Sequence, residues 1–237
     1  MTPKSAIRTL LDCAHCEHRA LRQFCNLDVD ALADFDSLGV HSDALPGMLL
    51  FEEDTPMRGV FVVCSGKVKL SSTSKLGKTL ILRIAGPGDV LGLGAAISGE
   101  RYEVTAQTIE PTQLKSIERG EFLAFLQRHG EGSLHAAQAL SAEYRSTFFD
   151  ARRLALSATA ASRLASVLLD WGRAAQCGKT EMRFTMALTH EELANLIGSS
   201  RETVTRMMGK FRREKLIQVR GATILVLAPE KLETFVA

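Results

Sequence analysis

Residues 189–220 constrain the fold of this 237-residue chain more than any other segment. Thr189 and Glu192 have the spacing of a capping box, which predicts that a short helix begins there. Gly198 ends that helix, because glycine takes positive φ at little steric cost. Ser199 and the glutamate three residues later repeat the capping-box spacing and predict a second helix to about residue 214. The pattern predicts a helix-turn-helix.

The second helix has one apolar and one basic face. At helical spacing the expected buried stripe is Val204, Met207, Met208 and Phe211. The outer face carries Arg201, Thr205, Arg206, Lys210 and Arg213. Residues 200–220 hold seven Arg or Lys and two Glu, a local charge of +5, whereas the whole chain carries only +2. Positive charge gathered on an amphipathic helix favours binding in the major groove of double-stranded DNA.

The segment Ser200–Arg206 reads S-R-E-T-V-T-R and resembles the recognition helix of the CRP/FNR family of bacterial transcription regulators, in the form of its CRP branch. The resemblance extends upstream over most of the chain. It implies that Arg201, Glu202 and Arg206 read base edges and that Ser200 and Thr203 contact phosphate. Thr189 and Lys210 complete the expected DNA-binding residues.

The family resemblance also implies partners. A homodimer would bind a pseudo-palindromic site whose half-sites resemble TGTGA, with RNA polymerase as a further partner. A charged face on an ordinary helical hairpin is the alternative interpretation of the same residues.

Upstream of this module the pattern changes to short strands. Between residues 38 and 117, turn pairs such as Pro46-Gly47 and Ser65-Gly66 separate segments such as Val60–Cys64 and Thr79–Ile84. Such spacing is typical of an antiparallel barrel or sandwich. The region resembles the cyclic-nucleotide-binding β-roll of the same family.

A long helix is expected at about residues 131–156. Its apolar positions, at spacings of three and four, are Ala137, Leu140, Tyr144, Thr147, Ala151 and Leu154. This is a coiled-coil pattern, which agrees with a dimer helix. Phe148 and Phe149 form a second apolar face, which we expect to pack against the roll.

The expected fold class is therefore α+β. The predicted segments are a cysteine-containing N-terminus (residues 1–27), a β-roll sensor domain (28–130), a dimerisation helix (131–156) and a winged helix-turn-helix DNA-binding domain (157–237).

The candidate effector pocket consists of Gly88, Leu93, Arg101 and Thr147. In cAMP-binding members a glutamate contacts the ribose, but Leu93 stands at that position here. Arg101 is one residue out of register with the arginine that binds the phosphate. Thr147 aligns with a contact made across the dimer. These departures argue against cAMP and leave another ligand in the same roll open.

The N-terminal cysteines suggest a metal site. Cys13, Cys16 and Cys25 have the spacing C-x2-C-x8-C, and three thiols in thirteen residues suit a soft metal. FNR-type members hold an oxygen-sensitive [4Fe–4S] cluster in a similar segment, but their fourth cysteine aligns with Lys115. The fourth ligand would then be Cys64, His15, His18 or a carboxylate. A zinc site of three cysteines and His18 is the alternative to iron–sulfur, and helix packing is the alternative to any metal.

Composition narrows the class of protein. The sequence shows no apolar stretch long enough for a secretory signal or a membrane span, so we expect a cytoplasmic protein with reduced thiols. We do not expect an enzyme: a cupin-type roll would need a cluster of histidines or carboxylates on neighbouring strands, and His41 is the only histidine in the strand region, residues 38–117. The remaining alternatives are a metal-binding adaptor without specific DNA recognition, and a regulator that responds to a small ligand in the roll rather than to a redox or gas signal.

Overall fold

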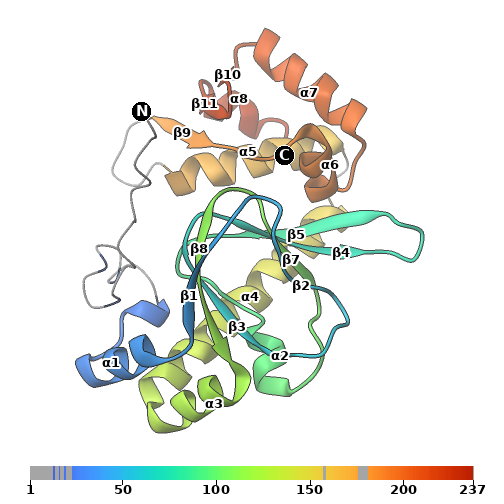
Figure 1. Ribbon diagram of the computed structural model, residues 1–237. Coiled ribbons are helices and arrows are strands. Elements are labelled where there is room, and N and C mark those ends of the chain that lie inside the picture. Colours follow the sequence, from blue (N-terminus) through green and yellow to red (C-terminus); the bar gives the residue numbers. More distant parts are fainter. Residues whose placement is uncertain are drawn as a thin grey trace, which may run out of the picture. The chain divides into compact units, whose positions relative to one another are not determined.

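The computed structural model describes residues 13, 16, 19, 23–156, 159–175 and 181–236 (Figure 1). The chain forms two compact units, residues 1–69 with 84–143 and residues 70–83 with 144–237. Within the described ranges, no helix is both long enough and apolar enough to cross a membrane.

The predicted roll consists of two four-stranded sheets, ordered β1-β8-β3-β6 and β2-β7-β4-β5. The strands are β1 (Val40–Ala44), β2 (Leu49–Phe51), β3 (Gly59–Ser65), β4 (Val68–Thr73), β5 (Thr79–Ala85), β6 (Val90–Leu91), β7 (Thr105–Thr108) and β8 (Thr112–Glu118). The strands predicted from the turn pairs agree with these bounds to within two residues. The central strand β8, which pairs antiparallel with both β1 and β3, lies almost entirely inside the region predicted to form strands, residues 38–117, although its own bounds were not predicted.

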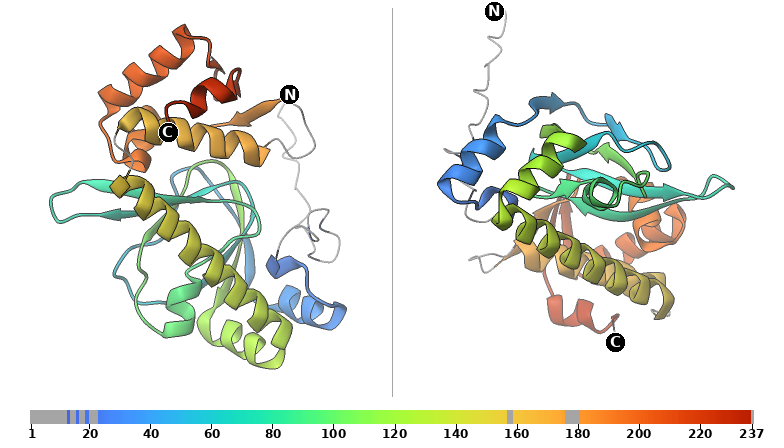
Figure 2. Two further views of the ribbon diagram at one scale, coloured as in Figure 1. Left: turned by 180° about the vertical axis from the view of Figure 1, so that it is seen from behind. Right: turned by 90° about the horizontal axis from the view of Figure 1, so that it is seen from below.

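Helices α1 (Val29–Ser37), α3 (Arg119–Arg128) and the first turns of α4 (Gly130–Leu156) lie side by side, and α2 (Leu93–Ser98) packs near them (Figure 2). A cluster of phenylalanine rings holds this end of the roll together. Phe35 lies 5.2 Å from Phe125, and Phe24, in the short 3-10 helix Gln23–Cys25, lies 5.9 Å from Phe122. All four side chains are almost fully buried, so the end of the cysteine-containing N-terminal segment is part of the core.

The apolar face of α4 differs from the prediction. Phe148 and Phe149 do not pack against the roll; they are 57% and 54% exposed. Leu140 packs against the phenylalanine cluster. Ala136, on the same face of α4, is buried in that cluster. The exposed positions at spacings of three and four are Leu134, Ala137, Ser141, Tyr144, Phe148 and Ala151. Of the predicted positions, Ala137, Tyr144, Thr147 and Ala151 are exposed and Leu140 is partly buried, and the side chain of Leu154 lies outside the described residues.

The C-terminal part contains α5 (Ala160–Ala175), β9 (Met182–Thr185), α6 (His190–Ile197), α7 (Arg201–Arg213), β10 (Ile217–Arg220), β11 (Thr223–Val226) and α8 (Pro229–Glu233). The strands form a sheet ordered β10-β11-β9. Leu164 and Leu168 of α5 are fully buried, as are Val204 and Phe211 of α7. This is the predicted helix-turn-helix followed by a β-hairpin wing.

The turn between α1 and β1 depends on Gly39. Its φ is +61°, and an added Cβ would lie 2.0 Å from the carbonyl oxygen of Ser116 in β8. Gly47 also has positive φ, +84°, but a Cβ added there would have no neighbouring atom within 4 Å. Comparing an alanine substitution at Gly39 with one at Gly47 therefore distinguishes the cost of the left-handed backbone conformation from the cost of a steric clash.

We expect Gly39→Ala to lower the free energy of unfolding by about 1–3 kcal/mol more than Gly47→Ala, because only Gly39 adds a clash to the left-handed conformation. Urea denaturation followed by circular dichroism measures both variants. Equal losses would show that Ser116 moves aside without cost.

Candidate nucleic-acid interface and sensor sites

The first helix of the helix-turn-helix begins as predicted. The hydroxyl of Thr189 accepts a hydrogen bond from the backbone amide of Glu192 (3.1 Å), and the Glu192 carboxylate accepts one from the amide of Thr189 (3.0 Å). Gly198 ends the helix with φ +60°. Arg163 of α5 donates from Nε to the carbonyl oxygen of Ile197 (2.6 Å). A cation at a helix C-terminus is favourable, so Arg163 fixes the turn.

The second helix begins one residue later than predicted. Its N-cap is Ser200, whose hydroxyl accepts from the amide of Thr203 (3.2 Å), so the predicted capping box at Ser199 is wrong. The carboxylate of Glu202 is exposed, and its pKa is lowered by hydrogen bonds from its own backbone amide and then from Ser200, with Arg201 adding a smaller attraction. Glu202 is therefore an ionised acceptor at the outer surface of α7.

The outer face of α7 is formed by arginines. Arg201 and Arg206 are exposed, as is Thr205 between them. Lys210 differs, because its Nζ lies 5.0 Å above the ring of Phe235 and 3.9 Å from the Glu214 carboxylate. The first two turns of α7 thus present two guanidinium groups and a carboxylate, which can donate to guanine and accept from cytosine.

His190 belongs to the same surface and was missed from the sequence. It is the first residue of α6, and its Nδ1 lies 2.9 Å from the hydroxyl of Thr205. The helix-turn-helix pattern could have indicated this contact, because the first turn of its first helix lies beside its second helix. Thr205 therefore has its hydroxyl oriented by a neighbouring helix.

The predicted effector residues have different surroundings in the structure. The amide of Gly88 donates to the carbonyl oxygen of Val63 (2.8 Å) in the turn before β6. Leu93 is 2% exposed and lies in the phenylalanine cluster, whereas Arg101 is at the surface and donates to the carbonyl oxygen of Asp54 (2.5 Å). Thr147 is exposed on α4. The side chain of Leu93 therefore contributes to the core, whereas that of Arg101 lies at the surface.

Tyr102, the residue after Arg101, is buried in the roll. It is 3% exposed and stacks on Phe51, with ring centroids 4.0 Å apart and planes at 11°. Its hydroxyl donates to the carbonyl oxygen of Gly59 (2.7 Å) and accepts from the amide of the same residue (3.2 Å). A cavity of about 750 Å³ is lined in part by this pair and by Arg58 and Glu118.

Comparison with known protein families agrees with both domains. Residues 162–235 match the model of the Crp-like helix-turn-helix domain. Residues 43–129 match the model of the cyclic nucleotide-binding domain. The chain belongs to the CRP/FNR family of transcription regulators.

Individual proteins support this family assignment. The transcriptional activatory protein AadR of Rhodopseudomonas palustris is 27% identical over 228 residues, 94% of this chain and 92% of that protein. The global nitrogen regulator of Synechocystis sp. is 30% identical over 191 residues, 77% of this chain and 82% of that protein. The structure of FixK2 from Bradyrhizobium japonicum has the same fold, with a TM-score of 0.75 at 21% identity, and covers 84% of this chain and 98% of FixK2.

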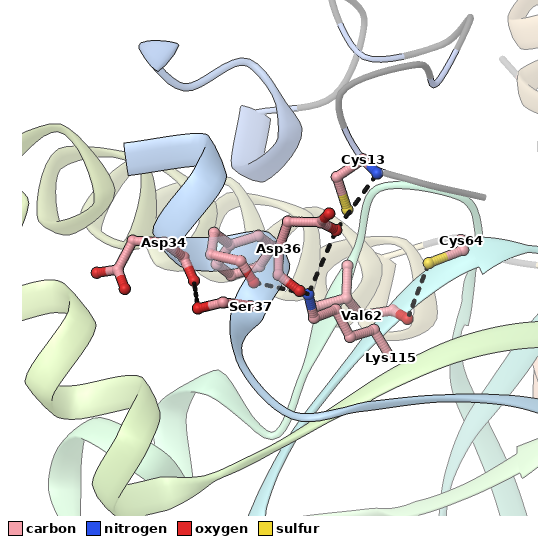
Figure 3. A network of polar contacts seen from close by, with 8 residues as sticks. Cys13, Asp34, Asp36, Ser37, Val62, Cys64 and Lys115 are labelled. Atoms are coloured by element: carbon pink, nitrogen blue, oxygen red, sulfur yellow. Dashed lines mark hydrogen bonds and ion pairs between the residues drawn. The ribbon is translucent and has the colours of Figure 1, made fainter. Parts of the chain in front are cut away.

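Cys13 of this CRP/FNR protein lies in a group of possible metal ligands. Its Sγ, a carboxylate oxygen of Asp36 and a ring nitrogen of His41 all lie within 4.8 Å of one another. The backbone amide of Cys13 donates to Asp36 Oδ1 (3.3 Å), and the two side chains approach each other (Figure 3). Lys115 of β8 reaches the same place, with Nζ 3.8 Å from Asp36 Oδ1.

The surroundings of this cluster shift two pKa values. Burial, followed by the hydrogen bond with Asp36, raises the pKa of the Cys13 thiol, while Lys115 partly opposes the rise. Burial and then the charge of Lys115 lower the pKa of His41. Cys13 therefore rests as a thiol and His41 as a neutral imidazole.

The iron–sulfur cluster of FNR-type members does not fit the described residues. A [4Fe–4S] cluster needs four ligands, normally thiolates. Of the predicted cysteine ligands only Cys13 belongs to this group of donors, and His18 and His15 lie outside the described residues. Asp36 is of the carboxylate type that was also considered as a ligand. Lys115, at the position of the family's fourth cysteine, donates instead to the carbonyl oxygens of Phe35 (2.6 Å) and Asp36 (2.8 Å).

Cys64, an alternative fourth ligand, is not a member of this group either. Cys64 lies in β3, and its Sγ lies 3.9 Å from the carbonyl oxygen of Val62 in the same strand (Figure 3).

Tyr102→Phe tests the buried hydroxyl. The variant leaves the amide and carbonyl of Gly59 without their partner, so we expect the free energy of unfolding to fall by about 1–3 kcal/mol. Tyr144, the second tyrosine of the chain, is 73% exposed, and Tyr144→Phe should change stability by less than about 0.5 kcal/mol. Urea denaturation measures both; equal effects would show that water replaces the Tyr102 hydroxyl.

Proposed function

We propose that this CRP/FNR regulator binds a pseudo-palindromic DNA site with TGTGA-like half-sites as a homodimer. The observation that carries the proposal is the exposed face at the start of α7, where Arg201, Glu202 and Arg206 are unobstructed and the helix end is capped by Ser200. Residues at this end of a recognition helix meet base edges in the major groove. Ser200, Thr203 and Thr189 are then placed at helix N-termini, where backbone amides favour phosphate.

Arg206→Ala should weaken binding to a TGTGA palindrome by about 1–3 kcal/mol and relax discrimination at one base pair. Gel-shift titration against the palindrome and against single-base variants measures both effects. Arg212, exposed at the last turn of α7, provides the control, since Arg212→Ala removes the same charge away from the base edges. A uniform loss on all sequences would mean that Arg206 contacts only phosphate.

The exposed stripe of α4 supports the dimer. Leu134, Ser141 and Phe148 repeat every seven residues, as do Ala137 and Tyr144, and all of these positions are exposed. Such a stripe is a coiled-coil seam when a second copy covers it. Two copies would place two recognition helices about 34 Å apart, on successive turns of DNA.

Phe148→Glu should dissociate the dimer, because it introduces a charge into the centre of this seam. Ser146→Glu, at an exposed position of α4 outside the seam, should leave the dimer intact. Analytical ultracentrifugation measures the mass of each variant. A monomeric wild-type protein, or dissociation by both variants, would contradict the proposed seam.

The remaining parts of the proposal follow from the family. Residues 28–130 would act as sensor, 131–156 as dimer helix and 157–237 as DNA-binding domain, in a cytoplasmic protein that contacts RNA polymerase. A redox or gas signal would act through the N-terminal segment 1–27 and a metal held there. The donor set around Cys13 supports a single metal ion more than an iron–sulfur cluster.

A small ligand in the roll is the second candidate for the signal. The cavity beside Tyr102 and Phe51 supports it, since aromatic faces and the charged side chains of Arg58 and Glu118 line the same space. cAMP does not suit this site, because the stacked Tyr102 occupies the roll next to the misplaced Arg101. An adaptor without specific DNA recognition would bind palindromic and random DNA equally in the gel shift above.

A further inference from the structure

Three different metal-binding groups converge where α1 ends and β1 begins. Asp36 lies in the last turn of α1, and His41 is the second residue of β1. The turn through Gly39 brings these two residues to the same side, and Cys13 arrives from the N-terminal segment. Among the residues that the structure describes, this is the one group of three or more histidine, cysteine or carboxylate side chains whose donor atoms lie within 4.8 Å of one another.

The donor types define the class of ion. A thiolate, an imidazole and a carboxylate are the three ligand types that zinc accepts, with bond lengths of about 2.0–2.3 Å and tetrahedral geometry. The three donor atoms lie within 4.8 Å of one another, so a contraction of about 1 Å brings them to the separations of a tetrahedral site. Three protein ligands leave the fourth position to water. Hard ions such as magnesium prefer oxygen ligands alone.

We propose that Cys13, Asp36 and His41 bind one zinc-class divalent ion, which ties the N-terminal segment to the β-roll. The inference rests on the proposed function in one respect: it names the metal site through which the N-terminal segment would signal. The thiol releases its proton to solvent when its sulfur binds the ion, and no electron is transferred. This ligand set replaces the one expected from the cysteine spacing.

Lys115 determines how this site is supported. Its side chain is 1% exposed and is fixed by the carbonyl oxygens of Phe35 and Asp36, so its ammonium stays beside the Asp36 carboxylate. A fixed partner of this kind orients a ligating carboxylate, as groups around metal sites commonly do. The positive charge also compensates part of the negative charge of thiolate and carboxylate.

The site joins segments that contribute to one core. Phe35, the neighbour of Asp36, packs in the phenylalanine cluster, and His41 is paired in register with Lys115. An ion bound here would restrain Cys13 against α1 and β1. Its loss would release the N-terminal segment at one point, without disrupting the phenylalanine cluster.

The test is a titration of the metal-stripped, full-length protein with Zn²⁺ and with Co²⁺, whose visible spectrum reports thiolate and tetrahedral ligation. We expect one ion per chain, with a sulfur-to-cobalt charge-transfer band. Cys13→Ser, Asp36→Asn and His41→Ala should each weaken binding by at least about tenfold, and Cys13→Ser should remove the charge-transfer band. Cys64→Ser, on the adjacent strand, is the matched control and should bind as the wild type does.

Two further variants separate this site from the one expected from cysteine spacing. Cys16→Ser and Cys25→Ser should keep both stoichiometry and spectrum. Loss of binding in these two variants with binding retained in His41→Ala would overturn the proposal, as would no saturable binding by the wild type. Iron and sulfide with an air-bleached visible band after anaerobic purification would also overturn it.

The gel shift tests the proposed DNA-binding function, and the cobalt titration tests the metal site independently. Failure of the wild-type protein to select the palindrome would contradict the proposed function, while the cobalt spectrum would still report the metal site. Selection of the palindrome without any metal binding would contradict the inference alone. Circular dichroism of each variant confirms that a lost spectrum reflects a lost ligand and not an unfolded chain.

Discussion

A buried ammonium group organises the N-terminal end of the roll. Lys115 lies in the central strand β8 with almost no exposed surface, and burying a charge is costly unless it is paired and hydrogen-bonded. The carbonyl oxygens of Phe35 and Asp36 and the Asp36 carboxylate provide those partners, and the ring of Phe35 lies 5.2 Å from Nζ. The end of α1 must therefore stay against β8. This requirement brings Asp36, His41 and Cys13 together.

A stacked pair of aromatic rings occupies part of the roll interior. Tyr102 stacks on Phe51, and its hydroxyl is hydrogen-bonded to the backbone of Gly59. Arg101, the expected phosphate contact, turns outward to Asp54. The adjacent residues Arg101 and Tyr102 therefore have opposite surroundings, one at the surface and one in the core.

Parts of the chain were predictable because local sequence decides them. The capping box at Thr189 and the positive φ of Gly198 depend on residues within one turn of helix, and both were predicted. The first residue of α7 was misplaced by one, because two adjacent serines offer the same cap and only the packing of Val204 and Phe211 selects Ser200. Strand β8 lies in the predicted strand region, but the burial of Lys115 within it was not predictable, because a buried lysine can be recognised only when its distant partners are known.

The sequence by itself determined the family, the helix-turn-helix and the basic residues at the start of α7, since each depends on spacing within a few residues. The tertiary structure alone decided which groups meet around Cys13, because Asp36, His41 and Lys115 are 23 to 102 positions away in the chain. It also decided which side of the first turns of α4 faces the core: Ala136 is buried in the phenylalanine cluster and Leu140 packs against it, while Leu134 and Ala137 are exposed. Helical periodicity allows several rotations of the helix, and only the packing of that cluster selects one.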